Sequence, residues 1–385
     1  MMKLAYVTTY NAEDVANWSG TGFHILQALR KQSLQVELIG SIKNKYSPVS
    51  LASKGREYLY KWLFKQKYLC DREPLLLKQY AKKTVQHLAE LKDVDLVFSP
   101  GTMHIGHLEC DRPIGFWTDA TFASLVDFYP QYSNLCEESL KNGHLMEQQT
   151  LDRCKIAIYS SEWSAQSAIN NYQIDPAKVK VVPFGANVNH HKNFKEIQSL
   201  IQSRPTNQCK LLFLGVDWYR KGGQIAFEVA KALNQSGLPT ELTVVGCEPI
   251  LDEPIPDFVK YLGFISKATT KGREKLNQII AQSHFLILPA IADCTPIVFC
   301  EANSFGVPCL SIKVGGIPTV IKDNINGKLF AQEAEISEYC QYIANLLTNY
   351  PQYQQLAYSA FHEYETRLNW TVAARTVKRL LQEAI

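Results

Sequence analysis

Short apolar runs alternate with segments of helical periodicity along nearly the whole chain. In the first half, a helix is predicted at Gly22–Gln32, between the first two apolar runs. The predicted strands of this half are Lys3–Thr8, Gln35–Ile39, Asp95–Phe98, Ile114–Trp117, Ile156–Tyr159 and Val179–Val182. Strands that alternate with helices in this way predict a parallel sheet covered by helices on both faces, which is the α/β class.

The same alternation begins again after residue 208. The predicted elements of the second half are the strands Leu211–Leu214, Glu241–Val245, Phe285–Leu288 and Pro308–Ile312 and the helices Gln224–Leu233 and Val298–Ser304. Residues 187–208 between the halves are polar and lack periodicity, so they are interpreted as an interdomain linker. We therefore expect two Rossmann-like domains, 1–186 and 209–368, and an amphipathic helix in 369–385. Parallel sheets bind phosphate-bearing ligands at the carboxyl ends of their strands, beside helix amino termini.

Composition narrows the class of protein. A chain of 385 residues favours two domains, and 40 basic against 37 acidic residues is too balanced for a protein dedicated to nucleic acid. The longest apolar run is too short to cross a bilayer, and the amino terminus turns polar at Thr8, too soon for a signal peptide. Ten scattered cysteines without a Cys-x-x-Cys pair indicate buried thiols rather than zinc or disulfides. A soluble cytoplasmic protein is expected.

The most informative stretch contains Asp293 and Glu301, with seven residues between them. Thr295 is predicted as the N-cap of a helix that has Pro296 at its first position. The amides that follow, of Ile297 and Val298, could then hold a phosphate oxygen, and Glu301 one turn later could accept hydrogen bonds from a ribose diol.

This stretch, residues 289–330, resembles the E-x7-E region of family 4 glycosyltransferases. The Glu-Ala-Asn-Ser-Phe-Gly-Val-Pro, Gly-Gly-Ile-Pro and Asn-Gly-Lys-Leu-Phe segments follow in the family's order. Members are retaining enzymes of the GT-B architecture, in which two Rossmann-like domains face each other across a cleft and a C-terminal helix crosses back to the first domain. Asp293 stands where Glu is usual, which retains a carboxylate for the sugar hydroxyls but shortens it by one methylene.

A second block, Phe213–Gly223, resembles the family's strand, loop and helix that carry an Arg and a Lys for the donor diphosphate. The resemblance places Lys221 at the Lys position, whereas the Arg position after Gly215 is Val216, and Arg220 is the nearest substitute. The loop Tyr261–Ser266 resembles the one whose backbone contacts the nucleobase; its residues assigned to the donor are Phe264 and Ile265.

The first half resembles the family more loosely. The predicted glycine-rich loop, which lies beneath the donor phosphates in the family, contains Gly20, Thr21 and Gly22. Asp119 falls where many members carry a histidine in the cleft, so the resemblance makes it a candidate catalytic residue beside Lys221, Arg220 and Asp293. The segment Val181–Asn187 resembles the family's exit from the first domain.

The resemblance implies a retaining transferase that moves a sugar from a UDP- or GDP-sugar to a hydroxyl of a sugar, lipid-linked or small acceptor in glycan, glycolipid or polysaccharide synthesis. It implies no cofactor and no essential metal; the Asp-x-Asp at Asp93–Asp95 precedes a strand, far from the donor blocks. Two alternatives stay open: a nucleotide-sugar epimerase of the same architecture, and a catalytically silent protein that binds sugar nucleotides.

One segment is not explained by this resemblance. Lys43–Lys67 holds seven basic residues against one acid, with aromatic residues interleaved. It is either a solvated helix with one apolar stripe or a face that meets anionic lipid or an anionic acceptor. His104, His107, His190 and His191 lack partners at metal spacing and are interpreted as structural or surface residues, and Cys294 as a small neutral residue of the site.

Overall fold

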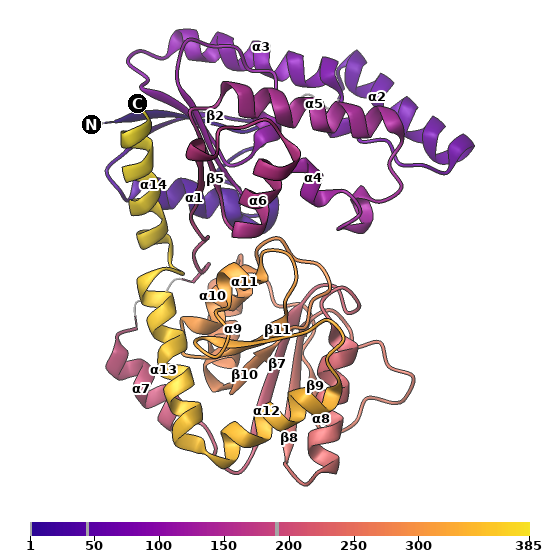
Figure 1. Cartoon of the computed structure of the whole chain (residues 1–385), viewed down its shortest axis with the longest axis vertical. Helices are drawn as coiled ribbons and strands as arrows, with labels where there is room; N and C mark the ends of the chain where they lie inside the picture. Colours follow the sequence, from indigo (N-terminus) through magenta and orange to yellow (C-terminus); the bar gives the residue numbers. More distant parts are fainter. Residues whose placement is uncertain (1, 44–45, 189–191) are drawn as a thin grey trace. The chain divides into compact units, whose positions relative to one another are not determined.

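The computed structural model describes residues 2–43, 46–188 and 192–385, so the predictions for His190 and His191 lie outside the described residues. The chain divides into two compact units (Figure 1). Unit 1 comprises Met1–Pro183 together with Trp370–Ile385, and unit 2 comprises Phe184–Asn369. The end of the chain therefore belongs to the same unit as its beginning.

Unit 1 is built on a six-stranded parallel sheet in the order β2-β1-β3-β4-β5-β6. Its strands are β1 (Lys3–Val7), β2 (Gln35–Ile39), β3 (Leu96–Ser99), β4 (Ile114–Thr118), β5 (Ile156–Tyr159) and β6 (Val179–Val181). The central strands β3, β4 and β5 are buried along their whole length. Strands buried on both faces read as continuous apolar runs, which is why the sequence locates them within one or two residues.

Helices cover both faces of this sheet (Figure 1). They are α1 (Thr21–Arg30), α2 (Pro48–Leu59), α3 (Pro74–Glu90), α4 (Phe122–Leu125), α5 (Glu137–Arg153), α6 (Glu162–Asn171) and α14 (Trp370–Ala384). The short turns η1 (Asn17–Gly20), η2 (Tyr60–Phe64), η3 (Cys70–Arg72), η4 (Thr102–His104), η5 (Pro130–Tyr132) and η6 (Pro176–Lys178) connect them. The amphipathic C-terminal helix α14 packs against α1, and Lys378 Nζ donates to the carbonyl of Gln32 at 2.8 Å.

Unit 2 repeats the design with a six-stranded parallel sheet in the order β12-β11-β10-β7-β8-β9. Its strands are β7 (Cys209–Gly215), β8 (Thr240–Gly246), β9 (Val259–Tyr261), β10 (Phe285–Ile287), β11 (Cys309–Ile312) and β12 (Gly327–Phe330). Its helices are α7 (Phe194–Gln202), α8 (Gly223–Gln235), α9 (Thr270–Gln282), α10 (Ile297–Asn303), α11 (Ile317–Val320), α12 (Ile336–Thr348) and α13 (Tyr350–Thr366). All pairings are parallel, so the strands end at one edge of the sheet.

The prediction that residues 187–208 form a linker without helical structure is wrong, because they contain helix α7, which belongs to unit 2. A capping box opens α7: Asn193 Oδ1 accepts from the amide of Glu196 at 3.1 Å, and Glu196 Oε2 accepts from the amide of Asn193 at 2.8 Å. Ile197 and Ile201 are fully buried. The helix has nine residues, and its apolar residues Phe194, Ile197, Leu200 and Ile201 recur at helical spacing, so the pattern was present in the sequence and was missed.

Arg204, in the same segment, ties the chain to unit 2. Its guanidinium donates to the carbonyls of Phe305 and Gly306, both at 2.8 Å, and to the hydroxyl of Tyr353 at 2.7 Å. A buried guanidinium with all these partners fixes one arrangement of the chain. In the part of the chain that the structure describes, no helix is both long and apolar enough to cross a membrane.

Candidate functional site

Two glycines bring the end of β7 against the end of β10. Gly222, which precedes α8, has φ 75°, and a Cβ there would lie 2.2 Å from the carbonyl oxygen of Pro289. Gly215 ends β7, and a Cβ there would lie 3.2 Å from Cγ of Lys221. Because Gly222 has no room for a side chain and Gly215 has only a tight contact with Lys221, Lys221 and the start of α8 lie directly beside the loop that follows β10.

Lys221 and Asp293 form an ion pair at this point, with side chains only 13% and 8% exposed. The other oxygen of the Asp293 carboxylate accepts from the amide of Thr295 at 3.2 Å. The backbone carbonyl of Asp293 accepts from the amide of Gly316 at 3.0 Å, which attaches the Gly-Gly-Ile-Pro loop to the same spot. The structure thus brings together two residues that lie 72 positions apart in the chain and that the resemblance assigned to the donor.

Arg220 braces the loop that carries Asp293. Its Nε lies 3.3 Å from Oδ2 of Asp217, and its Nη1 donates to the carbonyl of Ala292 at 3.0 Å. The carbonyl of Arg220 itself accepts from the amide of Ile291 at 2.9 Å. These bonds give Arg220 a positioning role toward Asp293. Val216, where the resembled family has its Arg, is 68% exposed.

The predicted start of the helix after Asp293 is wrong by one residue. Helix α10 begins at Ile297 with Pro296 as its N-cap, and no side chain caps it. The hydroxyl of Thr295 donates instead to the carbonyl of Cys294 at 2.6 Å. The turn held by the Asp293 carboxylate explains the shift, because it uses the Thr295 amide before the helix starts. The amides of Ile297 and Val298 still precede the first bond of the helix, from Phe299 to the carbonyl of Pro296 at 3.1 Å.

Glu301 lies in α10 and is 1% exposed. Both of its carboxylate oxygens accept from Lys267 Nζ, each at 2.6 Å. Lys267 was not predicted as a site residue; the available signal was its place directly after the loop assigned to the nucleobase, Tyr261–Ser266. In that loop Phe264 is 72% exposed, whereas Ile265 is partly buried against the core of unit 2.

The residues predicted in unit 1 follow the ends of β1 and β4. Gly20 has φ 82° and caps α1, and a Cβ on Gly22 would lie 2.3 Å from the hydroxyl oxygen of Tyr10. Thr21 is buried in the first turn of α1. Asp119 is half-buried directly after β4. Gly20 is therefore needed for its positive φ, and Gly22 is needed because the Tyr10 side chain leaves no room for a Cβ.

Comparison with known proteins identifies the domain that contains these residues. Residues 177–363 match the model of the family described as glycosyl transferases group 1. This part of the chain is a group 1 glycosyltransferase domain. The D-inositol 3-phosphate glycosyltransferase of Mycolicibacterium smegmatis is 24% identical over 247 residues, which are 61% of this chain and 54% of the relative. The amylovoran biosynthesis glycosyltransferase AmsK of Erwinia amylovora is 25% identical over 177 residues, 42% of each chain.

The chain spans about half the length of these curated relatives. Over the whole chain it is similar to HepE of Anabaena, solved in complex with UDP and glucose: the TM-score is 0.62 at 16% identity, and the match covers 99% of this chain and 100% of HepE. At this identity the likeness shows the fold, which is GT-B, so the predicted fold class is confirmed.

Unit 1, outside the matched domain, contains a buried polar cluster that the sequence did not predict. Glu147 of α5 accepts from the hydroxyl of Thr102 at 2.8 Å, and burial raises the pKa of its carboxyl to about 7. Burial, followed by the charge of Arg72, lowers the pKa of His104 to about 3, so this imidazole is neutral. Its Nδ1 lies 3.3 Å from the amide nitrogen of Thr9, which agrees with the structural role predicted for it.

Glu147 gives a testable pH dependence. Its pKa is 4.5 in an unfolded chain and about 7 in the folded protein, so its contribution to stability is complete below pH 4.5 and is lost as the pH rises through 7. We expect Glu147→Gln to raise the free energy of unfolding relative to the wild type between these pH values, by up to about 3 kcal/mol. Urea titrations along this range measure the difference. Glu90→Gln, at an exposed position, is the control. If the free energy of unfolding of Glu147→Gln changes with pH in parallel with that of the wild type, the prediction is wrong.

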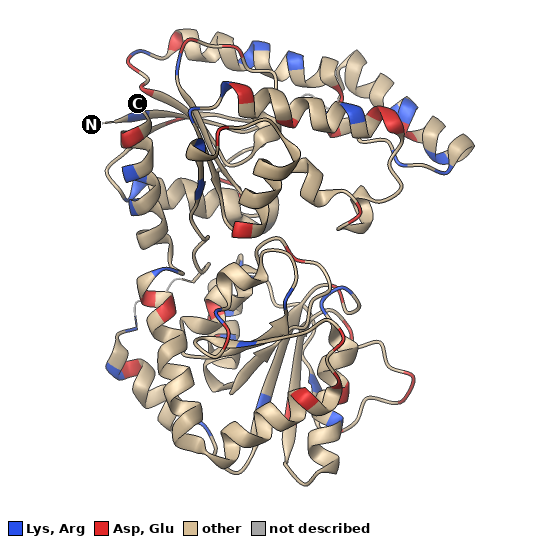
Figure 2. Cartoon of the chain, in the orientation of Figure 1, with Lys and Arg blue, Asp and Glu red and all other residues tan. Residues whose placement is uncertain are grey.

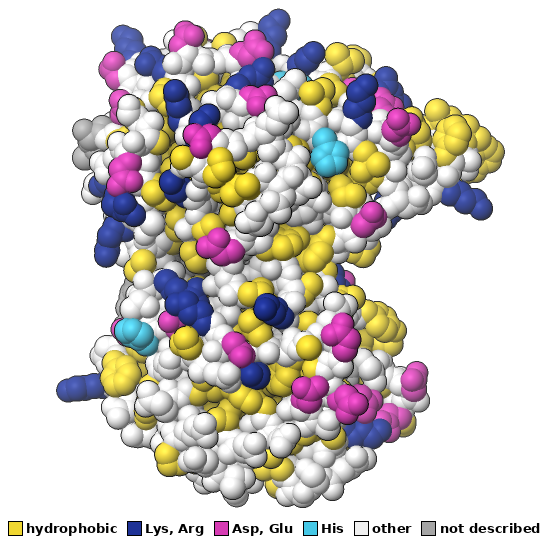
Figure 3. Space-filling view, viewed as in Figure 1, with side chains coloured by type: hydrophobic (Ala, Val, Ile, Leu, Met, Phe, Trp, Pro, Cys, Tyr) yellow, Lys and Arg dark blue, Asp and Glu magenta, His cyan; other side chains and the backbone are white. Residues whose placement is uncertain are grey.

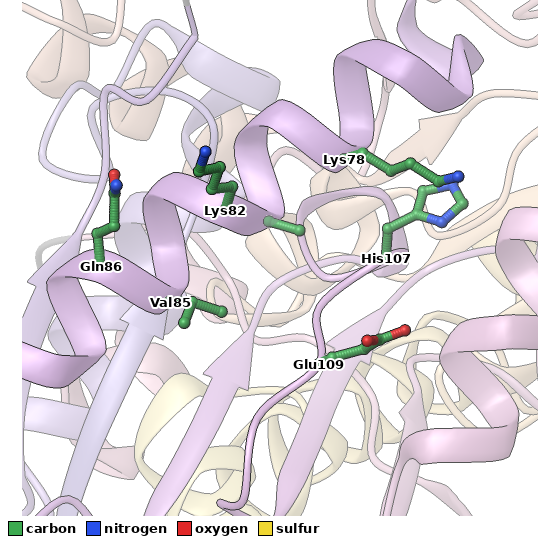
Figure 4. Close-up of a pocket in the computed structure, with 7 residues that line it drawn as sticks. Lys78, Lys82, Val85, Gln86, His107 and Glu109 are labelled. Atoms are coloured by element: carbon green, nitrogen blue, oxygen red, sulfur yellow. The ribbon is translucent and has the colours of Figure 1, made fainter.

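Unit 1 also has an open pocket of about 540 Å³ on its surface (Figure 4). Helix α3 contributes Lys78, Lys82 and Gln86, and the loop after η4 contributes His107 and Glu109. Burial lowers the pKa of His107, and the charge of Lys78 beside it adds to the effect. None of the residues predicted to bind the donor lines this pocket.

Proposed function

We propose that this chain is a retaining glycosyltransferase that moves a sugar from a nucleotide-sugar donor to a hydroxyl of a sugar, lipid-linked or small acceptor in the cytoplasm. The observation that carries the proposal is the ion pair of Lys221 with Asp293, beside the starts of α8 and α10 in the group 1 domain. A buried cation, a carboxylate and two helix amino termini at one strand edge suit a sugar diphosphate.

In the proposed reaction, the bond from the anomeric carbon to the diphosphate breaks and a bond to the acceptor oxygen forms. The acceptor proton passes to an oxygen of the leaving phosphate. Lys221 and the amides at the start of α10 meet the negative charge that develops on the diphosphate, as fixed groups aimed at it before the reaction starts. An ammonium has three donors, so Lys221 can contact Asp293 and a phosphate oxygen together.

Asp293 is proposed to accept from a sugar hydroxyl, and Glu301 from the ribose diol. Glu301 is buried, and Lys267 balances its charge, so a carboxylate is stable there before the donor binds. We propose that protein groups alone neutralise the diphosphate, without a metal ion. HepE, a structural relative at 16% identity, was solved with UDP and glucose, which makes UDP-glucose the first donor to test.

Thermal-shift screening against UDP-, GDP- and ADP-sugars, followed by transfer assays with and without EDTA, tests the proposal. A cognate donor present at about 100 times its Kd should stabilise the protein by about 2.7 kcal/mol. Transfer to an acceptor, with retention and in excess EDTA, is the expected result.

Three other outcomes would overturn parts of the proposal. Donor binding with neither transfer nor hydrolysis would indicate a silent binding protein. Conversion of the donor sugar without any acceptor would indicate an epimerase. Loss of transfer in EDTA that Mg²⁺ or Mn²⁺ restores would show that the charge on the diphosphate is met by a metal.

A further inference from the structure

Helix α2 and the π-turn η2 form one continuous projection of unit 1, residues 48–64, which we call the α2 arm. Figure 3 shows hydrophobic side chains gathered at the tip of this projection, and Figure 2 marks its basic positions. Lys65, directly after the arm, ends the helical turn with a left-handed backbone, φ 52°. Hydrophobic side chains at the tip of a projection are unusual for a surface that meets only water.

One face of the arm is fixed to the rest of unit 1. Arg56 Nη1 lies 3.1 Å from the carboxylate of Glu73 and 2.9 Å from that of Glu138. The ring of Tyr60 stacks on Tyr68 with centroids 5.5 Å apart. The positions of this inner face recur at helical spacing and are Val49, Ser53, Arg56 and Tyr60. These contacts set the direction in which the opposite face points.

The opposite face presents large apolar side chains to solvent. Leu51, Tyr58 and Trp62 share it at helical spacing, and they are 55%, 75% and 83% exposed. Gly55 lies between Leu51 and Trp62 on this face. No atom lies within 4 Å of where its Cβ would be, so nothing covers the apolar stripe that these residues form. Further exposed apolar side chains of the arm are Leu59, Leu63 and Phe64.

Basic residues border this apolar stripe. Lys54, Lys61 and Lys65 are exposed, and among the described residues none of them has a carboxylate within 4 Å. Glu57 is the only acid of residues 43–67, and it accepts from the thiol of Cys70 at 3.3 Å. The arm therefore combines an unpaired positive charge with an exposed aromatic and aliphatic face.

We propose that the α2 arm binds the surface of a membrane that contains anionic lipids. Tyr58, Trp62 and the neighbouring aliphatic side chains enter the interface, where amphipathic aromatic rings are favoured, and the lysines contact anionic headgroups. A second copy of the chain fits less well, because a symmetric contact between two arms brings like charges together. This inference goes beyond the proposed function and does not depend on it.

Co-sedimentation of the whole chain with lipid vesicles tests the proposal without donor or acceptor. We expect binding to phosphatidylcholine vesicles that contain phosphatidylglycerol, no binding to phosphatidylcholine alone, and release at about 0.5 M salt, where charges are screened within about 4–5 Å. Lys54→Glu with Lys61→Glu should lower the partition coefficient by about 25-fold or more, because each of the two lysines contributes about a factor of five and the new carboxylates repel the anionic lipids. Trp62→Ala with Tyr58→Ala should lower it by a similar factor.

The matched control is Lys271→Glu with Lys275→Glu, the same change of charge at two exposed positions of α9 in unit 2. It should bind within about twofold of the wild type if the lysines of the arm act locally, within a screening length of about 10 Å. Absence of binding at any salt, or equal loss in the control, would overturn the proposal. So would a dimer that Trp62→Ala dissociates while vesicles leave the protein in solution, because the arm would then be a contact between copies.

Discussion

Lys221→Ala is expected to lower kcat for sugar transfer by about 10²-fold or more, on the order of 2.7 kcal/mol, with a much smaller change in donor KM. Negative charge grows on the leaving diphosphate as its bond to the sugar breaks. An interaction that strengthens on the way to the transition state appears in kcat more than in KM. In the proposed site, Glu301 and the amides at the start of α10 still bind the nucleotide in this variant. Steady-state kinetics with varied donor concentration measures both constants.

The ion pair with Asp293 requires a control, because Lys221→Ala leaves a carboxylate with an 8% exposed side chain unpaired. Breaking a buried pair typically costs about 3–5 kcal/mol of stability. Lys221→Met combined with Asp293→Asn removes both charges and should recover stability in thermal melts, but not kcat. A raised donor KM at unchanged kcat in Lys221→Ala would mean that Lys221 only binds the donor. Recovery of transfer in the double variant would mean that its role is to neutralise Asp293.

Arg220→Ala distinguishes a positioning residue from one that meets the diphosphate. Its guanidinium is bonded to Asp217 and to the carbonyl of Ala292, one residue before Asp293. We therefore expect a loss in kcat of only a few-fold, accompanied by a lower melting temperature. A loss as large as that of Lys221→Ala at an unchanged melting temperature would show that Arg220 takes the place of the cation absent at Val216.

Glu301→Gln is expected to weaken binding of the nucleoside diphosphate by roughly 1.5–3 kcal/mol, the contribution of hydrogen bonds to a charged group. Gln removes the charge and replaces one of the two acceptor oxygens with an NH₂ donor, so it cannot accept from both hydroxyls of the ribose diol. Titration calorimetry with UDP and GDP measures the affinity.

Lys267 provides the matched variant for this measurement, since its ammonium contacts both oxygens of Glu301 at 2.6 Å. In a double-mutant cycle with Lys267→Met, the loss caused by Glu301→Gln should persist. If it vanishes in the Lys267→Met background, the carboxylate acts only by placing the lysine. Unchanged affinity in Glu301→Gln with an intact fold would remove the ribose role.

The sequence by itself predicted most of the strands, because strands buried on both faces need apolar residues at consecutive positions, as in Phe285–Ile287. The short strands β9 and β12, which are not buried along their whole length, were not predicted. It also indicated candidate residues in the loops after β7 and β10, since carboxylates and cations are visible in the sequence without coordinates. Asp293 and Glu301 were named from their spacing together with the family resemblance, and Lys221 was named from the resemblance alone. The segments that do not carry a strong local pattern were less predictable.

Only the tertiary structure decided which of these groups meet. Lys221 pairs with Asp293 because Gly222 allows α8 to start against Pro289, and Lys267 reaches Glu301 across 34 positions of the chain. Helix α7 belongs to unit 2 because Ile197 and Ile201 are buried there, and α14 belongs to unit 1 because it packs against α1. Glu147 and His104 have shifted pKa values because folding removes them from water. Each of these features depends on contacts between residues distant in the chain, and a local pattern contains no information about such contacts.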